Sequence, residues 1–174
     1  MSYPEGMATV VSDTLYHTEL IDGQELPKPL PTKLHFLIQT FLILTLGKLL
    51  PKSYIAGPEL NVTCGDDRLV PDVTVVSRGA RYANGDLADP PVLCVEILSP
   101  GQTLVQLLGK ADRLVRSGTP MVWVVWPERK KAWMLTNDDL VEAKDLLDTR
   151  LPDGSMIQVQ TAEMWAELDE LSLN

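Results

Sequence analysis

Two carboxylates in this sequence interrupt apolar runs that are typical of buried strands. Asp72 lies in the run 69–76 (LVPDVTVV), and Glu96 lies in the run 92–98 (VLCVEIL). An unpaired buried carboxylate costs several kcal/mol, so each group is expected to be paired or neutralised. On adjacent strands the two acids would repel each other unless a cation lies between them, and a hard divalent ion with oxygen ligands meets that need. The alternative is that each acid pairs with an arginine, for instance Arg68, Arg78 or Arg113.

Lys110 is the third residue with chemical potential. It falls in 102–117, where apolar residues recur at helical spacing, and it borders the apolar stripe beside Leu107 and Leu114. From there its side chain could reach over the end of the strand that carries Glu96. A solvated lysine that lies along its apolar neighbours explains the same position equally well.

The elements that must position these residues alternate between strands and helices. Asp22-Gly23 predicts a hairpin turn, and the prolines at 27, 29 and 31 end its second strand. A long helix is expected over 32–50, with Thr32 as its cap, Pro51 as its stop and much of its surface buried. The remaining predicted strands span 54–62, 69–76, 91–98, 120–126, 131–135 and 156–159, and the remaining helices span 102–117 and 161–168.

Composition limits the class of protein. The chain has 174 residues, 45% of them hydrophobic, which suits one domain over 16–174 after a flexible end at 1–15. We find no apolar run long enough to span a bilayer and no secretory signal, so a cytoplasmic location is expected. The formal net charge of −9 argues against nonspecific binding of nucleic acid by an evenly charged surface. Two cysteines are too few for a disulfide framework and are expected as buried free thiols.

The ordered blocks of this sequence resemble the Uma-two restriction-endonuclease family, from about residue 16 to about residue 168. The blocks are 19–23 (ELIDG), His35, 70–73 (VPDV), 91–100 (PVLCVEILSP), Lys110, Gly118 and 122–127 (VWVVWP). The resemblance implies an α/β fold with a PD-(D/E)XK restriction-endonuclease-like core, in which helices flank a mixed sheet.

The resemblance also implies roles for individual residues. Asp72 would be the acid of the Pro-Asp motif and Glu96 the second acid, and both would bind Mg²⁺ or Mn²⁺. Leu98 stands where the usual lysine follows the second acid, and Lys110 stands where family members supply a lysine from the next helix. Glu25 would be an additional acid near the metal. Gln106, one turn before Lys110, could orient water or phosphate.

Three functional hypotheses follow. The first is a divalent-metal-dependent endonuclease that hydrolyses phosphodiester bonds of nucleic acid, with DNA as the expected substrate. The second is a catalytically degenerate protein of the same fold that serves as a binding or oligomerising module. The third is a structural domain that forms a homodimer through an exposed aromatic surface at Trp123, Trp126 and Trp133, although tryptophans at this density are more often core residues than interface residues.

Overall fold

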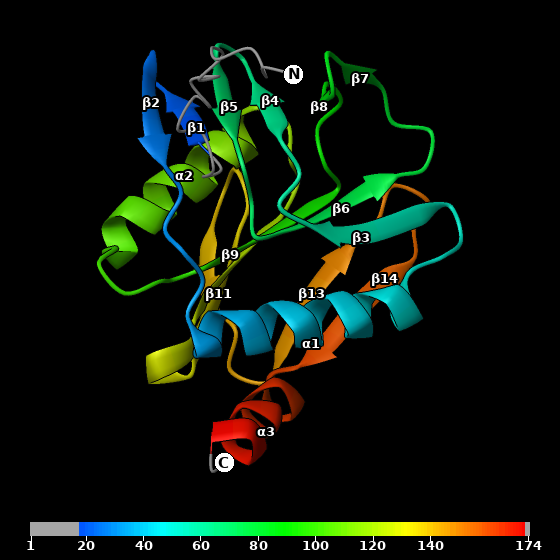
Figure 1. The fold of residues 1–174 in the computed structure, drawn as a ribbon. Helices are drawn as coiled ribbons and strands as arrows, with labels where there is room; N and C mark the ends of the chain where they lie inside the picture. The colour runs from blue at the N-terminus through cyan, green and yellow to red at the C-terminus, as the bar shows by residue number, and fades with distance from the viewer. Residues whose placement is uncertain (1–17, 173–174) are drawn as a thin grey trace, which may run out of the picture.

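A six-stranded mixed sheet forms the centre of the computed structural model, which describes residues 18–172 (Figure 1). The flexible end expected at 1–15 lies outside the described residues. The strands run in the order β12-β11-β10-β9-β6-β3, with β9 and β10 parallel and all other neighbours antiparallel. Their bounds are β3 Tyr54–Pro58, β6 Val73–Ser77, β9 Leu93–Ile97, β10 Val122–Trp126, β11 Lys131–Leu135 and β12 Leu140–Glu142.

Helices cover both faces of this sheet. α1 (Lys33–Leu49) packs on one face, and α2 (Leu104–Arg116), which connects the parallel strands β9 and β10, packs on the other. Because strand residues alternate between faces, Leu93 and Val95 of β9 pack in the α1 layer, whereas Cys94 packs in the α2 layer. α3 (Thr161–Ser172) lies against α1. The predicted α/β architecture is therefore confirmed, with β9 as a central buried strand.

A second sheet stands above the carboxyl end of β9 (Figure 1). Its strand order is β2-β1-β5-β4-β8-β7. The predicted hairpin is present, and its turn residues Asp22 and Gly23 have φ of 51° and 75°, the left-handed values that a tight hairpin turn requires. The bounds are β1 Thr18–Ile21, β2 Gln24–Pro27, β4 Val62–Cys64, β5 Asp67–Leu69, β7 Tyr82–Ala83 and β8 Asp86–Leu87.

The strands expected at 54–62 and 69–76 are each broken in two, which corrects the sequence prediction. In each run the two halves belong to different sheets: β3 and β6 lie in the central sheet, whereas β4 and β5 lie in the second sheet. The breaks fall at Glu59, which has φ 50°, and at Pro71, which has no N–H to donate to a ladder. Asp72 therefore lies in a bend just before β6, and not inside a strand.

Two strands were not predicted from the sequence. They are β12 and β13 (Leu146–Arg150), and β13 pairs with β14 (Met156–Gln160). α1 is less buried than expected, since Phe36 and Leu44 are 58% and 61% exposed. The tryptophans pack mainly in the core: Trp123 is fully buried, its Nε1 donates to the Asp148 carbonyl, and Trp126 and Trp133 are half-buried.

Helix ends follow the sequence closely. The Thr32 side chain accepts the His35 N–H, and a capping box of Thr103 and Gln106 starts α2. η1 (Pro127–Arg129) turns β10 into β11. Both cysteines are buried free thiols, as predicted. Within residues 18–172, every helix is too short or too polar to cross a bilayer.

Gly118 fixes the exit of α2, and its replacement is expected to destabilise the fold. Its φ is 108°, and an added Cβ would lie 2.9 Å from Pro90 Cγ. Gly118→Ala should lower the free energy of unfolding by about 2–4 kcal/mol, the sum of backbone strain and overpacking. Gly154→Ala is the matched control, because Gly154 has φ 87° but open space around it, so only about 1 kcal/mol of strain is expected. Urea denaturation measures both, and equal losses would contradict the close-approach argument.

Candidate active site

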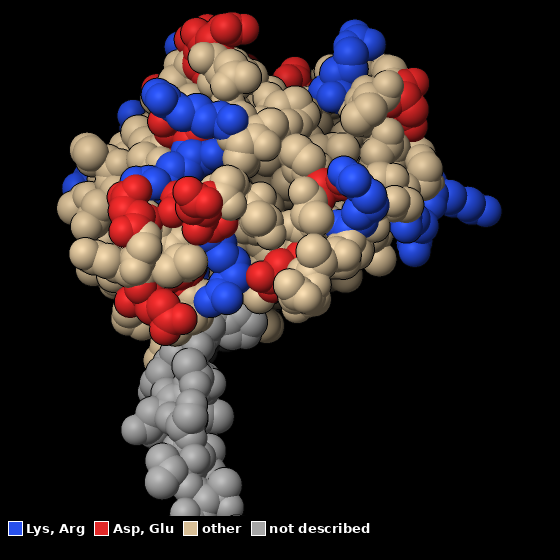
Figure 2. Space-filling view, turned by 90° about the horizontal axis from the view of Figure 1, so that it is seen from above, with Lys and Arg blue, Asp and Glu red and all other residues tan. Residues whose placement is uncertain are grey.

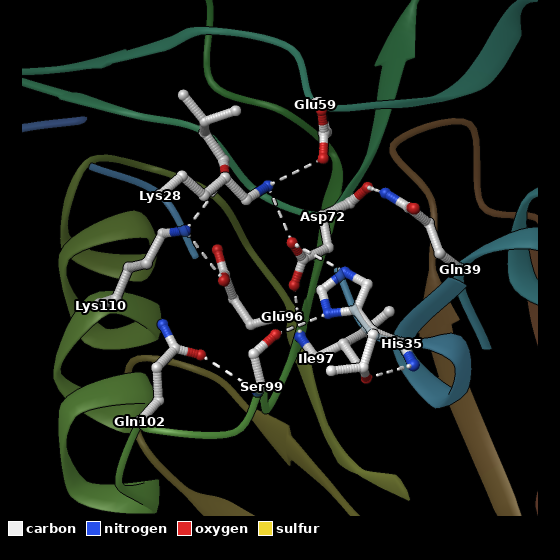
Figure 3. A network of polar contacts seen from close by, with 12 residues as sticks. Lys28, His35, Gln39, Glu59, Asp72, Glu96, Ile97, Ser99, Gln102 and Lys110 are labelled. Carbon is white, nitrogen blue, oxygen red and sulfur yellow. Dashed lines mark hydrogen bonds and ion pairs between the residues drawn. The ribbon is translucent and has the colours of Figure 1, made fainter. Parts of the chain in front are cut away.

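Strand register brings the two predicted carboxylates together. β6 and β9 are antiparallel with Val73 opposite Val95, and continuing this register by one residue places Asp72 opposite Glu96. Where the ladder ends, Asp72 Oδ2 accepts the backbone N–H of Ile97 at 2.6 Å. Both acids are buried, with only 2% and 1% of their surface exposed. Figure 3 shows the two side chains pointing into one polar cluster.

Asp72 is surrounded by hydrogen-bond donors and positive charge. Lys28 Nζ, in the segment between β2 and α1, lies 2.8 Å from Asp72 Oδ1, and His35 Nε2 lies 3.3 Å from the same oxygen. Ser99 Oγ lies 2.9 Å from His35 Nδ1, and Gln39 Nε2 donates to the Asp72 carbonyl. Burial by itself raises the pKa of Asp72, but the hydrogen bond from His35 and the charge of Lys28 outweigh it and hold that pKa well below its usual value. Asp72 is therefore ionised.

Glu96 has a different environment. Lys110 Nζ lies 3.0 Å from Glu96 Oε2, whereas Oε1 is buried and has no hydrogen-bond partner among the described residues. Burial raises the pKa of Glu96 to about 8; the charge of Lys110 opposes this rise, and the carboxylates of Asp72 and Glu19 add to it. Glu96 thus holds a proton at neutral pH in the metal-free protein.

Lys110 extends from α2 into the cluster and also contacts the segment that connects β5 and β6. Its Nζ contacts Glu19 Oε1 at 2.6 Å and donates to the Val70 carbonyl, while the Val70 N–H donates to the same Glu19 oxygen. Val70 lies outside both ladders, so Glu19 and Lys110 satisfy backbone groups that would otherwise be orphaned. Burial lowers the pKa of Lys110, but the charges of Glu96 and Glu19 outweigh it and raise that pKa above its usual value.

Negative charge exceeds positive charge in the cluster. Three buried carboxylates, on Glu19, Asp72 and Glu96, face two ammonium groups, on Lys28 and Lys110, and the partly exposed Glu59 lies 3.7 Å from Lys28 Nζ. Protonation of Glu96 lowers this surplus negative charge, which agrees with the direction of its pKa shift. A divalent cation would lower the same surplus while Glu96 stays ionised.

The oxygen atoms of the cluster suit a hard divalent cation whose remaining ligands are water or substrate oxygens. Carboxylate oxygens are the ligands such ions prefer, and the unpartnered Oε1 of Glu96 is an acceptor available to one. Within residues 18–172, no three His, Cys, Asp or Glu side chains are grouped to hold a metal by themselves. Mg²⁺ is commonly held by one or two carboxylates, with water and substrate phosphate completing its shell. The cavity at the cluster has a volume of about 10 Å³, roughly one water sphere. It is too small to hold a phosphate, which would have to approach from outside the cavity.

A larger groove leads to this cavity. It lies between the β1–β2 hairpin and α2, has a volume of about 790 Å³, and shares Glu19, Pro29, Gln102 and Lys110 with the wall of the small cavity. Glu19 therefore borders both spaces, whereas Asp72 and Glu96 line the small cavity beyond the groove.

Two of the predicted site residues lie apart from the cluster. Glu25 is exposed on β2, opposite Leu20, so its side chain leaves the hairpin on the face opposite to Glu19. Gln106 lines the groove, but its side-chain oxygen accepts the Thr103 N–H in the capping box of α2. The structure brings Asp72, Glu96 and Lys110 together and leaves these two outside.

The arginine alternative is wrong for both carboxylates. Arg113 instead joins the turns of the two hairpins, with contacts of 2.6 Å to Asp22 and 2.7 Å to Asp67. Arg78 Nε donates to the Lys52 carbonyl. Two lysines supply the positive charge around the acids, and His35 lies 3.3 Å from Asp72 Oδ1.

Sequence reasoning missed Glu19, Lys28, His35 and Ser99 as members of the cluster. Glu19 and His35 fall in the blocks that carried the family resemblance, and Ser99 follows the strand that holds Glu96. Their positions in and beside these blocks were the features of the sequence that could have identified them as site residues. Lys28 gave little signal, since it lies among prolines in an irregular segment.

Fold and site together define a class: a PD-(D/E)XK restriction-endonuclease-like core, in which helices flank a mixed sheet that carries two adjacent acids. The chain belongs to the Uma2 family, described as "Putative restriction endonuclease", which matches residues 7–168. Its fold is similar to the crystal structure of a putative nuclease belonging to DUF820 from Anabaena variabilis ATCC 29413 (24% identity, TM-score 0.72, 87% of this chain and 90% of that chain covered). No curated protein matches the chain.

Glu19 and Glu25 provide a matched test of the cluster, because they are acids on the two paired strands of one hairpin. Glu19→Gln removes a buried charge from Lys110 and should lower the free energy of unfolding by about 3 kcal/mol. Glu25→Gln changes an exposed residue and should stay within about 0.5 kcal/mol of wild type. Chemical denaturation measures both, and equal stabilities would show that the Glu19–Lys110 contact contributes nothing.

The raised pKa of Glu96 predicts a pH dependence of stability in EDTA. The unfolded chain releases this proton near pH 4.5, whereas the folded protein keeps it until about pH 8. The folded state binds more protons in that window, so the free energy of unfolding should fall as pH rises from about 4.5 to about 8 and then level off. Glu96→Gln should remove this component, on the order of a few kcal/mol, and exposed Glu128→Gln should not. Parallel curves for wild type and Glu96→Gln would refute the assignment.

Proposed function

We propose that this protein is a divalent-metal-dependent endonuclease that hydrolyses phosphodiester bonds of nucleic acid, with DNA as its substrate. One observation carries the proposal: the register of β6 and β9 sets two buried acids side by side, and a lysine from the following helix contacts one of them. The unpartnered Glu96 oxygen and the groove that reaches the cluster support it.

Asp72 and Glu96 would hold the Mg²⁺ or Mn²⁺ ion. When bound, such an ion lowers the pKa of a coordinated water and stabilises the negative charge that develops on the phosphate. Asp72 is prepared for this role because the Ile97 N–H and His35 fix its carboxylate in one orientation. His35 is in turn fixed by Ser99.

Lys110 would act at the base of the groove. Its ammonium group remains charged at neutral pH and borders both the groove and the small cavity. A fixed positive charge there favours a scissile phosphate over solvent and supports charge development without reorganisation. Leu98 occupies the position at which the usual lysine would stand, so Lys110 would supply that charge from α2.

A specific observation favours the second hypothesis, a catalytically degenerate binding module. Each of the two acids already has an ammonium partner, Lys28 for Asp72 and Lys110 for Glu96. Such a cluster can be a purely structural feature, because breaking any one of its buried pairs is costly. An ion would then have no role.

Nicking of supercoiled plasmid separates the two hypotheses. Wild-type protein should nick the plasmid with Mn²⁺ or Mg²⁺ and not in EDTA. Asp72→Asn and Glu96→Gln should each lower the rate by at least about 100-fold, because each removes a charged ligand. Glu128→Gln, an exposed acid far along the chain, should nick at the wild-type rate.

A thermal-shift titration with Mn²⁺ completes this test. A metal-binding enzyme is stabilised by the ion, and the stabilisation should disappear in both acid variants. Nicking that survives both substitutions would rule out the proposed site. Absence of both nicking and metal-dependent stabilisation in wild type would favour the binding module.

A further inference from the structure

The groove has two walls that differ in character. The hairpin wall is mainly apolar, formed by Ile21, Leu26, Pro27 and Pro29, and the α2 wall carries Lys110 together with Arg113 and Arg116. Its volume of about 790 Å³ is that of a pocket for a ligand of a few connected rings, and is small for a double helix. It shares Glu19 and Lys110 with the small cavity that Asp72 and Glu96 line, so a ligand in the groove can contact these two members of the cluster.

A glycine in the middle of α2 faces this groove. Glycine in a helix interior costs about 1 kcal/mol relative to alanine, so it needs a reason. Packing supplies none, because a Cβ at Gly109 would have no heavy atom within 4 Å. Gly109 lines the groove, and any side chain there would project into it. Gly109 therefore leaves the helix backbone uncovered on the groove side.

The positive charges in the groove already have acidic partners. Arg113 is held by Asp22 and Asp67, and Lys110 would share its charge between the cluster acids and a phosphate. Within the described residues, Arg116 pairs with Asp112 in an exposed i,i+4 contact, which is weak and easily exchanged. Figure 2 shows the same mixture on the face that bears the hairpins, where basic and acidic side chains alternate without a continuous basic surface. Duplex binding normally uses many phosphate contacts, and this surface offers few.

Resting on the proposed function, we propose that the groove receives an unpaired nucleic-acid strand and that a fully paired duplex does not reach the acids; a supercoiled plasmid would be nicked where its strands separate. Bases pack on the apolar hairpin wall, the backbone passes Gly109, and one phosphate reaches Lys110 at the edge of the cluster. A single strand can enter a confined groove and needs fewer charge contacts than a duplex. Asp72 and Glu96 line the small cavity beyond the groove, where a rigid double helix cannot follow.

Gly109 and Gly47 allow a matched test. Both are exposed glycines within long helices, and an added Cβ meets nothing within 4 Å at either, but only Gly109 lines the groove. Gly109→Leu and Gly47→Leu should each raise Tm by about 2–4 °C through helix propensity. The full chain is titrated in EDTA against a short fluorescent single-stranded DNA and against the same strand annealed to its complement.

Wild type should bind the single strand at least about 10-fold more tightly than the duplex. Gly109→Leu should weaken single-strand binding by about 10-fold or more, whereas Gly47→Leu should bind like wild type. With one or two phosphate contacts, log affinity should fall with log salt at a slope of about −0.7 to −1.4.

Three results would overturn the inference: equal or tighter binding of duplex, a Gly109→Leu variant that binds like Gly47→Leu, or no saturable binding of the single strand. Binding is measured without metal, so its outcome is separate from that of the nicking assay. Loss of nicking with intact strand binding would reject only the catalytic proposal. Nicking of duplex with no Gly109 effect would reject only the groove.

Discussion

Burial of three carboxylates at one point is the constraint on which the surrounding structure depends. Glu19, Asp72 and Glu96 come from three separate segments, and none of them can remain ionised away from water without positive charge or hydrogen-bond donors. Lys28 and Lys110 supply the charge, and the Ile97 N–H supplies a donor. The hairpin, the segment before α1, and α2 must all take up their observed positions to bring these groups together.

The breaks in the two long apolar runs serve the same end. The chain leaves the central sheet after β3, forms the β4–β5 hairpin of the upper sheet, and returns at β6. The return passes through Val70, Pro71 and Asp72, where the backbone leaves one ladder before entering the next. Lys110 and Glu19 bond both polar groups of the Val70 backbone. The bend therefore removes the Val70 backbone from both ladders while keeping it buried and, two residues on, directs Asp72 toward Glu96.

The cluster can be stable in two forms, and this links its stability to the proposed chemistry. Without metal, a proton on Glu96 lowers the surplus negative charge, and Lys28 lies against Asp72. With a divalent ion, the ion would replace the proton and compete with Lys28. Strong ion pairs in the metal-free protein would then weaken the apparent metal affinity, since the ion would first have to displace them. Such competition would suit a site that completes its metal shell with water and substrate phosphate.

The sequence by itself determined the local elements and the identity of the acids. Periodicity, caps and the Asp22-Gly23 turn predicted both α1 and α2, the central strand β9 and the first hairpin, because these depend on residues close together in the chain. Asp72 and Glu96 stood out because charge is rare in buried runs. Only the tertiary structure decided their partners. Lys28 lies 44 residues from Asp72, and Glu19 lies 91 residues from Lys110, and no local pattern encodes pairing over such separations. Lys110, only 14 residues from Glu96, was the partner that the sequence suggested. Glu25 shows the same limit: a register of two short strands, invisible in composition, directs it to solvent while Glu19 enters the cluster.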